Sequence, residues 1–555
     1  MKRFVPIMLL FAGSLMIPAT AAAQNDSPEE PEIVLPTALL RVDSIPFERV
    51  EAVLPGGSQI VLPPLDIPLP SVHEMDVQPR VLMPDSAEAM EPVESSVFST
   101  GIITAGSKNL IEGQLGVFKL GQDPRFRLTF NHQGLDGYGR KPAGTGYFRS
   151  RQDLNGWLGS AIGPLGIESS LGFSERQEGL QQASGSYYST VLRFLQGGAE
   201  VEARPDELIG VYGLLDAGTV SRRFTVSQND QVPPSDKEDY LLASVRLAIE
   251  LPAFELSLAA EYGYQDIHAG GQEEIEASHD SAVVVRFDAH PRSHIDIFGN
   301  AGAQWLIGDR FEYPFEFGLN YRNEGWLEVS GRFGRRTERQ LLHGLWQEMP
   351  LLDMPETRVP DPSAEWFVGM DSQADFLQQN LRVQGGVEYT VDFMDRMLPG
   401  AFSEVADDED FPQTGFEWGI YSGSELKGNL DVQYQINRFL RLQLGYNAAV
   451  PLFATVASPV VPLHHGVLGL TFGTEDGMYG GEIDTDFPFY SRLSMPFLDI
   501  SGFAQVTDGV LLRAGARDVL SPFLEGERYQ FGSVSGFSPF IEPGIRFMLS
   551  AEITL

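Results

Sequence analysis

The sequence predicts an all-β protein, a transmembrane antiparallel β-barrel of about 22 strands, with about 18 to 20 as the alternative count. Three observations lead to this prediction. Apolar and polar residues alternate with a period of two over hundreds of residues, short turns alternate with longer polar loops, and the chain begins with an export signal. Together they place the barrel in a bacterial outer membrane.

Residues 1–23 have the pattern of a secretory signal peptide. Lys2 and Arg3 form the charged start, residues 4–18 the apolar core, and three alanines at residues 21–23 the cleavage site. A retained membrane anchor is the alternative, but the apolar run is short and ends in alanines. The chain contains no cysteine, which excludes a disulfide framework and a thiolate metal site.

The chain is strongly acidic, with a formal net charge of −37. Such a charge repels the phosphates of nucleic acid, so no nucleic-acid partner is expected. It suits lumen walls and outer loops that contact water and divalent cations. A salty habitat explains the acidity equally well.

Residues 24–97 form a separate acidic segment with twelve prolines. Proline removes backbone donors and fixes φ, so extended polyproline-like structure is expected. The short apolar run at residues 60–62 suits docking on another surface, and a disordered periplasmic linker is the equal alternative. The predicted organisation is therefore a signal peptide at 1–23, a Pro-rich acidic periplasmic or lumenal segment at 24–97, and a transmembrane barrel at 98–555.

The hairpin at residues 429–448 carries the clearest strand pattern. On both sides of its turn, apolar residues alternate with polar ones, so each kind occupies one face. Other predicted strands carry charges in their middle, as at Arg246 and Glu316. These charges would be costly in the dry core of a soluble sandwich and are favourable in a wet lumen. The apolar faces are therefore expected to meet lipid and the polar faces to line the lumen.

Gly, Pro, Asn and Asp mark the expected tight turns between strands. A turn at 107–109 divides residues 100–120 into two strands, and further turns are predicted at 121–124, 163–164, 204–206, 251–253, 291–292, 323–325, 437–438, 475–477 and 507–509. Counting hairpins between them predicts about fourteen strands up to Phe393 and about eight from Phe416 onwards. An acidic connection at residues 397–414 separates the two groups.

The largest predicted loop spans residues 337–379 and contains Trp346 and Trp366. It is expected either to fold over the mouth or into the lumen, or to remain a surface loop. A barrel of about 22 strands is wide enough to need an obstruction. The two candidates within the chain are residues 24–97 and this loop, and residues 24–97 are the favoured one.

The last residues, 545–555, alternate strictly up to the terminus. They resemble the C-terminal signal read by the barrel-assembly machinery, except that they end in Leu555 and not in an aromatic residue. The strand count, the N-terminal extension and the Pro-Gly-Ile-Arg-Phe sequence at 543–547 resemble TonB-dependent outer-membrane receptors. The resemblance covers residues 98–555 and implies solute uptake through the barrel.

Members of that family carry a globular plug, and residues 24–97 are too short and too Pro-rich to be one. One short stretch resembles the box through which such receptors bind TonB, which implies TonB or another periplasmic protein as a partner: Glu32, Ile33, Val34 and Leu35. The expected function is passage of a solute across the outer membrane. The alternative is a non-transporting barrel whose N-terminal segment binds a periplasmic or membrane partner.

The sequence contains none of the motifs G-x-x-x-x-G-K-[ST], H-E-x-x-H or G-x-S-x-G. Catalysis, a cofactor and a metal site are therefore not expected, and His464 and His465 are interpreted as ordinary loop residues. A basic cluster at the outward end of one strand would contact lipopolysaccharide or another anionic ligand, or would only offset nearby acids: Arg332, Arg335, Arg336 and Arg339. Aromatic residues near strand ends are expected at the membrane interface: Trp157, Trp305, Trp326, Tyr321 and Phe333.

Overall fold

The computed structural model describes residues 97–554 with the exception of several gaps. The gaps are residues 120–122, 183–186, 207, 227–234, 269–276, 307–309, 324, 339–340, 349–362, 378, 403–415, 455–462, 475–476, 490–494, 508, 525–527 and 529–539. The predicted signal peptide, residues 24–96 of the segment predicted at 24–97 and the TonB-box-like residues 32–35 lie outside the described residues, whereas Val97 is described and belongs to the first strand.

Nearly every described element is a β-strand, because period-two alternation fits no helical face. The strands are β1 Val97–Gly106, β2 Ile111–Lys119, β3 Arg125–Asp136, β4 Phe148–Ile162, β5 Leu165–Gly179, β6 Tyr187–Ala203, β7 Ile209–Val226, β8 Ser235–Leu251, β9 Phe254–His268, β10 Ser278–Arg292, β11 Ile295–Leu306, β12 Arg310–Glu312, β13 Phe315–Asn323, β14 Leu327–Glu338, β15 Ser363–Phe376, β16 Leu381–Phe402, β17 Phe416–Asn437, β18 Leu440–Ala454, β19 His464–Gly473, β20 Tyr479–Phe489, β21 Phe497–Thr507, β22 Val510–Arg517 and β23 Arg546–Thr554. The two described helices are α2 Leu342–Glu348 and the 3₁₀ turn η2 Ser521–Phe523.

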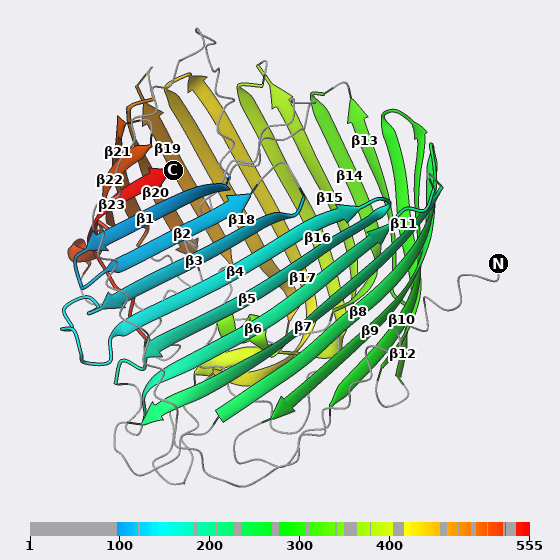
Figure 1. The fold of residues 1–555 in the computed structure, drawn as a ribbon, viewed down its shortest axis with the longest axis horizontal. Coiled ribbons are helices and arrows are strands. Elements are labelled where there is room, and N and C mark those ends of the chain that lie inside the picture. The colour runs from blue at the N-terminus through cyan, green and yellow to red at the C-terminus, as the bar shows by residue number, and fades with distance from the viewer. Residues whose placement is uncertain are drawn as a thin grey trace. The chain divides into compact units, whose positions relative to one another are not determined.

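The strands form one closed antiparallel barrel (Figure 1). Each strand pairs with its neighbours in the chain, and β1 closes the ring by pairing with β23. β12 and β13 both pair with β11 in one continuous register, since Gln304 faces Glu312 and Ala301 faces Phe315. Pro314 between them has no N–H to give to the ladder. The two segments therefore form one interrupted strand, and the barrel has the predicted 22 strands.

Several predicted boundaries were wrong although the total was right. The loop predicted at 337–379 contains β15, so fifteen strands precede residue 403 and seven follow, when β12 and β13 are counted together. The missed hairpin turns at residues 377–380 without glycine or proline, and Leu377 and Gln379 adopt φ values of 52° and 70°. Side chains rarely adopt this left-handed region, so the sequence carries no turn signal there.

Two further boundaries differ by a few residues. β10 continues through Arg292, so the turn predicted at 291–292 lies at residues 293–294. β16 continues to Phe402, so the first part of the connection predicted at 397–414 is strand. The remainder of that connection falls among residues 403–415, which the structure does not describe.

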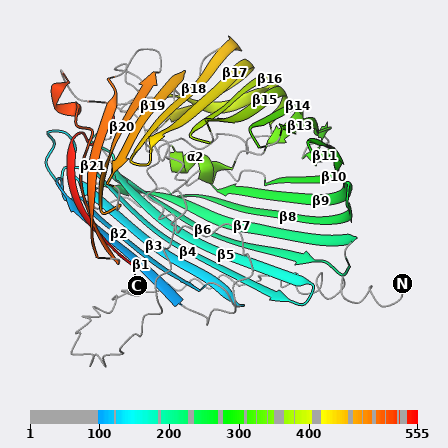
Figure 2. The same cartoon turned by 90° about the horizontal axis from the view of Figure 1, so that it is seen from above.

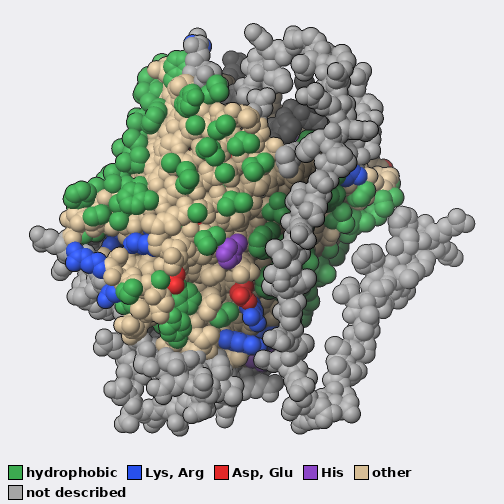
Figure 3. Space-filling model, turned by 60° about the vertical axis from the view of Figure 1, so that its left-hand side comes forward, with side chains coloured by type: hydrophobic (Ala, Val, Ile, Leu, Met, Phe, Trp, Pro, Cys, Tyr) green, Lys and Arg blue, Asp and Glu red, His purple; other side chains and the backbone are tan. Residues whose placement is uncertain are grey.

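The two faces of each strand differ as predicted. On β8, Val245, Leu247 and Ile249 are 53%, 49% and 47% exposed, and they alternate with Ser244 and Arg246. Figure 3 shows apolar side chains spread over the outward surface of the strands, with charged side chains gathered toward one end. Such an apolar outer face is what a transmembrane barrel presents to lipid.

Loops from distant parts of the chain pack together over the closure between β23 and β1. Leu110, Leu135, Tyr138, Tyr147 and Ile541 form a buried cluster there. Burial raises the pKa of the Tyr138 hydroxyl, so this group stays neutral. Among the described helices, none is long and apolar enough to cross a membrane.

Candidate functional site

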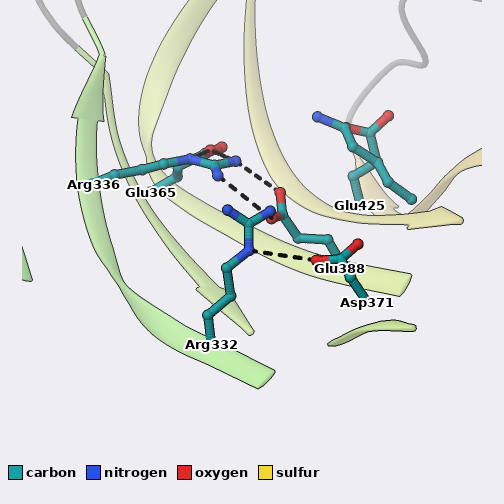
Figure 4. A network of polar contacts seen from close by, with 7 residues as sticks. Arg332, Arg336, Glu365, Asp371, Glu388 and Glu425 are labelled. Atoms are coloured by element: carbon teal, nitrogen blue, oxygen red, sulfur yellow. Dashed lines mark hydrogen bonds and ion pairs between the residues drawn. The ribbon is translucent and has the colours of Figure 1, made fainter. Parts of the chain in front are cut away.

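A ladder of charged residues lines the inner wall from β14 to β17. β14 contributes Arg332 and Arg336, β15 contributes Glu365 and Asp371, and β16 contributes Glu388 (Figure 4). Period-two alternation places these side chains on the face opposite Phe333 and Val368, which are 50% and 52% exposed. We call these five residues the β14–β17 ladder, together with the neighbouring Glu425 and Lys427 of β17.

Glycine makes the ladder continuous across β15. In the strand register, Gly369 stands between Arg332 on one side and Glu388 on the other. A Cβ atom at Gly369 would lie 3.6 Å from both Arg332 Nε and Glu388 Oε2. Because this position has no side chain, the arginine and the glutamate meet over β15, and Arg332 Nη2 lies 3.0 Å from Glu388 Oε2.

Glu388 joins the two arginines of the ladder. Its Oε1 atom lies 2.8 Å from Arg336 Nη2, and Arg336 also forms an ion pair with Glu365. Arg332 Nε lies 3.9 Å from Asp371 Oδ2. The ring of Phe367 lies 4.8 Å from the Arg336 guanidinium and 5.8 Å from that of Arg332. Charge-assisted contacts and the aromatic ring therefore hold both guanidinium groups in fixed positions.

Carboxylates outnumber basic groups in this ladder. Glu425 pairs with Lys427, whose Nζ lies 3.2 Å from Glu425 Oε2, so that the two arginines are left with Glu365, Asp371 and Glu388. The arginine charges are thus already compensated within the wall. An anionic ligand would have to compete with these carboxylates, whereas a polar or cationic group would meet a favourable surface.

The structure brings together two of the four arginines predicted as an anion-binding cluster. Arg332 and Arg336 share the ladder, whereas Arg335 is displaced by one position along β14 and forms an ion pair with Glu312 of β12. Arg339 and the TonB-box-like residues lie outside the described residues. Because Arg332 and Arg336 belong to the inner wall, an anionic contact there would involve a ligand in the lumen. Contact with lipopolysaccharide remains a prediction for the rest of the cluster.

A short helix contacts the inner wall on β7 and β8. α2 belongs to the connection between β14 and β15, and Figure 2 shows it inside the ring of strands. Its Leu342 and Trp346 side chains are completely buried. The Trp346 ring lies 4.8 Å from the Arg222 guanidinium of β7, and the Leu342 amide donates a hydrogen bond of 2.8 Å to Glu238 Oε1 of β8. We call Arg222, Glu238 and the residues that hold them the α2 anchor.

The wall beneath this contact is built from buried charges and apolar side chains. Arg222 Nη2 lies 2.6 Å from Asp236 Oδ2, and Gln265 Nε2 donates to Glu238 Oε1 at 2.6 Å. In the strand register, Leu192 faces Arg222, whereas Val220 and Ile267 both face Glu238. These three apolar residues are buried. Their apolar character on the lumen side is the sequence signal that would have revealed this site.

The predicted aromatic positions are partly corrected. Trp305, Trp326, Tyr321 and Phe333 are exposed, as interfacial residues should be. Trp157 is different, because it shares the inner face with Asp153 and its Nε1 atom donates to Glu168 Oε2 at 3.3 Å. The expectation of an interfacial position for Trp157 was therefore wrong, and the alternation along β4 is the reason.

The two adjacent histidines also differ from the prediction. His464 and His465 begin β19 and do not lie in a loop. His465 Nε2 lies 2.5 Å from Asp486 Oδ1 in the buried part of the wall, and His464 Nδ1 lies 2.7 Å from the Tyr446 hydroxyl. Among the described residues, no group of three or more acidic or histidine side chains is arranged to hold a metal ion.

The sequence matches no family model and no curated protein. Solved structures do match. The FrpB iron transporter from Neisseria meningitidis has a TM-score of 0.64 at 8% identity, over 84% of this chain and 83% of that one. The copper transporter OprC gives 0.63 at 12% identity, over 84% and 81%. A ferric enterobactin receptor from Pseudomonas aeruginosa gives 0.60 at 9% identity, over 84% and 81%.

The fold is that of the TonB-dependent receptor barrels. Identities of this size establish the fold alone, so the comparison does not assign a solute to this chain. Strand number, antiparallel closure and an apolar outer face agree with the fold and define a barrel of the bacterial outer membrane.

Proposed function

We propose that this barrel passes a polar solute across the outer membrane through its lumen. The β14–β17 ladder is the observation that carries the proposal, because it holds compensated charges in fixed positions on the inner wall. Fixed, compensated charges on the lumen face offer hydrogen-bonding groups to a polar solute. The similarity in fold to proteins named as iron and copper transporters supports the same conclusion, as well as a non-enzymatic role.

The outer face of the barrel and its C-terminal strand indicate two kinds of partner. The apolar outer face supports contact with outer-membrane lipid, and the C-terminal strand, which closes the barrel, supports assembly by the barrel-assembly machinery. Coupling to TonB through residues 32–35 remains a prediction. If it is correct, deleting those four residues will abolish energy-dependent uptake and leave the barrel folded.

Planar-bilayer recordings of the purified chain test the proposal. We expect conductance, and we expect its charge selectivity to depend on the ladder. Glu388→Gln removes the carboxylate that joins Arg332 and Arg336, so the pore should become more selective for anions, and the reversal potential reports this change. Arg336→Gln removes a positive charge, so the pore should become more selective for cations.

Arg193→Gln is the matched control, because Arg193 pairs with Glu175 on the outer side of β6. Its substitution should leave the reversal potential unchanged. No current from the full chain, from a chain lacking residues 24–97 and from a chain with the α2 residues replaced would contradict transport and favour the non-transporting docking barrel.

A further inference from the structure

The side of the wall that α2 contacts is established by the alternation along β8. Val245, Leu247 and Ile249 point outward and are exposed, whereas Glu238 belongs to the opposite face. Since α2 donates its Leu342 amide to Glu238, the helix lies on the lumen side of the strand. Figure 2 shows the same arrangement, with α2 surrounded by strands. The described part of this connection therefore enters the barrel.

The contact is built as a specific attachment. Trp346 and Leu342 lie four positions apart, so both side chains project from one face of the helix, and both are completely buried. Arg222, which stacks on Trp346, is itself 3% exposed and is held by Asp236. Glu238 is fully buried as well and accepts from α2 and from Gln265. A loop that merely rested on the barrel would not need buried, paired charges beneath it.

In the described structure, the side of α2 that carries Gly344 is exposed. Gly344 is exposed, and a Cβ atom built there would meet no atom within 4 Å among the described residues. Among the described residues, the helix therefore has one face attached to β7 and β8, and the opposite face, at Gly344, is free; we call it the free face. A helix in this position narrows the part of the lumen through which a solute can pass.

We infer that α2 is an internal obstruction of the lumen, held against the wall by Trp346, and that a solute passes along its free face. The inference rests on the proposed function and adds to it the element that narrows the route. The helix and the β14–β17 ladder both lie on the lumen side of the barrel wall.

Releasing the helix is the first test. Trp346→Ala removes the buried ring that packs on Arg222 of the α2 anchor and should raise single-channel conductance, because α2 is no longer fixed to the wall. Trp366→Ala is the matched control, since Trp366 is 45% exposed on β15 and does not touch the anchor in the described structure. Both variants should keep the heat-modifiable migration of a folded barrel.

Blocking the free face is the second test. The chain has no cysteine, so Gly344→Cys introduces a single thiol on α2. Reaction with a bulky maleimide during recording should produce a stepwise loss of current. Ala143→Cys, in the exposed loop between β3 and β4, should react with the same reagent without a change in current.

The outcomes separate the inference from the proposed function. Conductance in the unmodified chain that responds neither to Trp346→Ala nor to modification of Gly344→Cys would contradict the obstruction and leave transport intact. The obstruction would also be contradicted if replacing residues 341–348 opened nothing while deletion of residues 30–90 produced current. A silent unmodified chain that conducts once Trp346 is replaced would confirm that α2 closes the route.

Discussion

The wall beneath α2 and the β14–β17 ladder share one pattern of paired charges, but the arginines in the two regions differ in how far they are exposed. Both place arginine opposite carboxylates on the lumen face of neighbouring strands. The side chain of Arg222 is 4% exposed and that of Arg336 is 35% exposed. The difference lies at the arginines: Trp346 of α2 covers Arg222, whereas Arg336 stays partly open to the lumen although its partner Glu365 is buried.

Burial under the helix changes how much an ion pair contributes to stability. An exposed ion pair contributes about 0–1 kcal/mol, because water and salt screen it. Removing one partner of a buried pair costs about 3–5 kcal/mol, because the other charge stays in a poor environment. The covered pair therefore holds a structural element, whereas the open ladder is available to interact with whatever passes.

The largest effect is expected at the covered pair. Arg222→Ala should weaken α2 attachment by about 3–5 kcal/mol, because it takes away both the partner of Asp236 and the group stacked on Trp346. Hydrogen exchange of the Leu342 amide, which donates to Glu238, measures this directly. Exchange that is as slow as in the unmodified chain would show that the attachment does not depend on Arg222.

A second prediction tests the premise that polar faces line the lumen. Leu442→Arg places a cation on the face that carries the exposed Leu444 and Tyr446, and should cost about 2–4 kcal/mol near the middle of the membrane. Gln443→Arg changes the opposite face, where Gln443 bonds to Asp431, and should have little effect on assembly. The fraction of heat-modifiable folded protein in outer membranes distinguishes them, and equal damage from both would reverse the assignment of the faces.

The smallest effect is expected in the open ladder. Arg332→Gln should change the stability of the barrel by no more than about 1 kcal/mol, since the side chains of Arg332 and Asp371 are 36% and 54% exposed and Glu388 keeps Arg336 as a partner. The midpoint of heat modification should therefore barely move, while Leu342 exchange stays unchanged. A large shift of the midpoint would place this pair in the same class as Arg222–Asp236.

Much of the barrel was predictable because its information is local. Period-two alternation, as at residues 429–448, assigns strands and faces from nearest neighbours along the chain. Turns with glycine or proline were found, as at Gly163 and Pro164. The hairpin at residues 377–380 was missed, because its left-handed positions are occupied by ordinary side chains.

What the sequence by itself determined was a closed outer-membrane barrel with a polar lumen, whereas only the tertiary structure decided that α2 lies inside it. Trp346 and Trp366 fall in one predicted loop, yet the first is fully buried inside the barrel and the second is exposed on a strand. The contact between Leu342 and Glu238 joins residues 104 positions apart. No local period encodes such a contact, since it forms only when the closed ring brings the inner face of β8 within reach of α2.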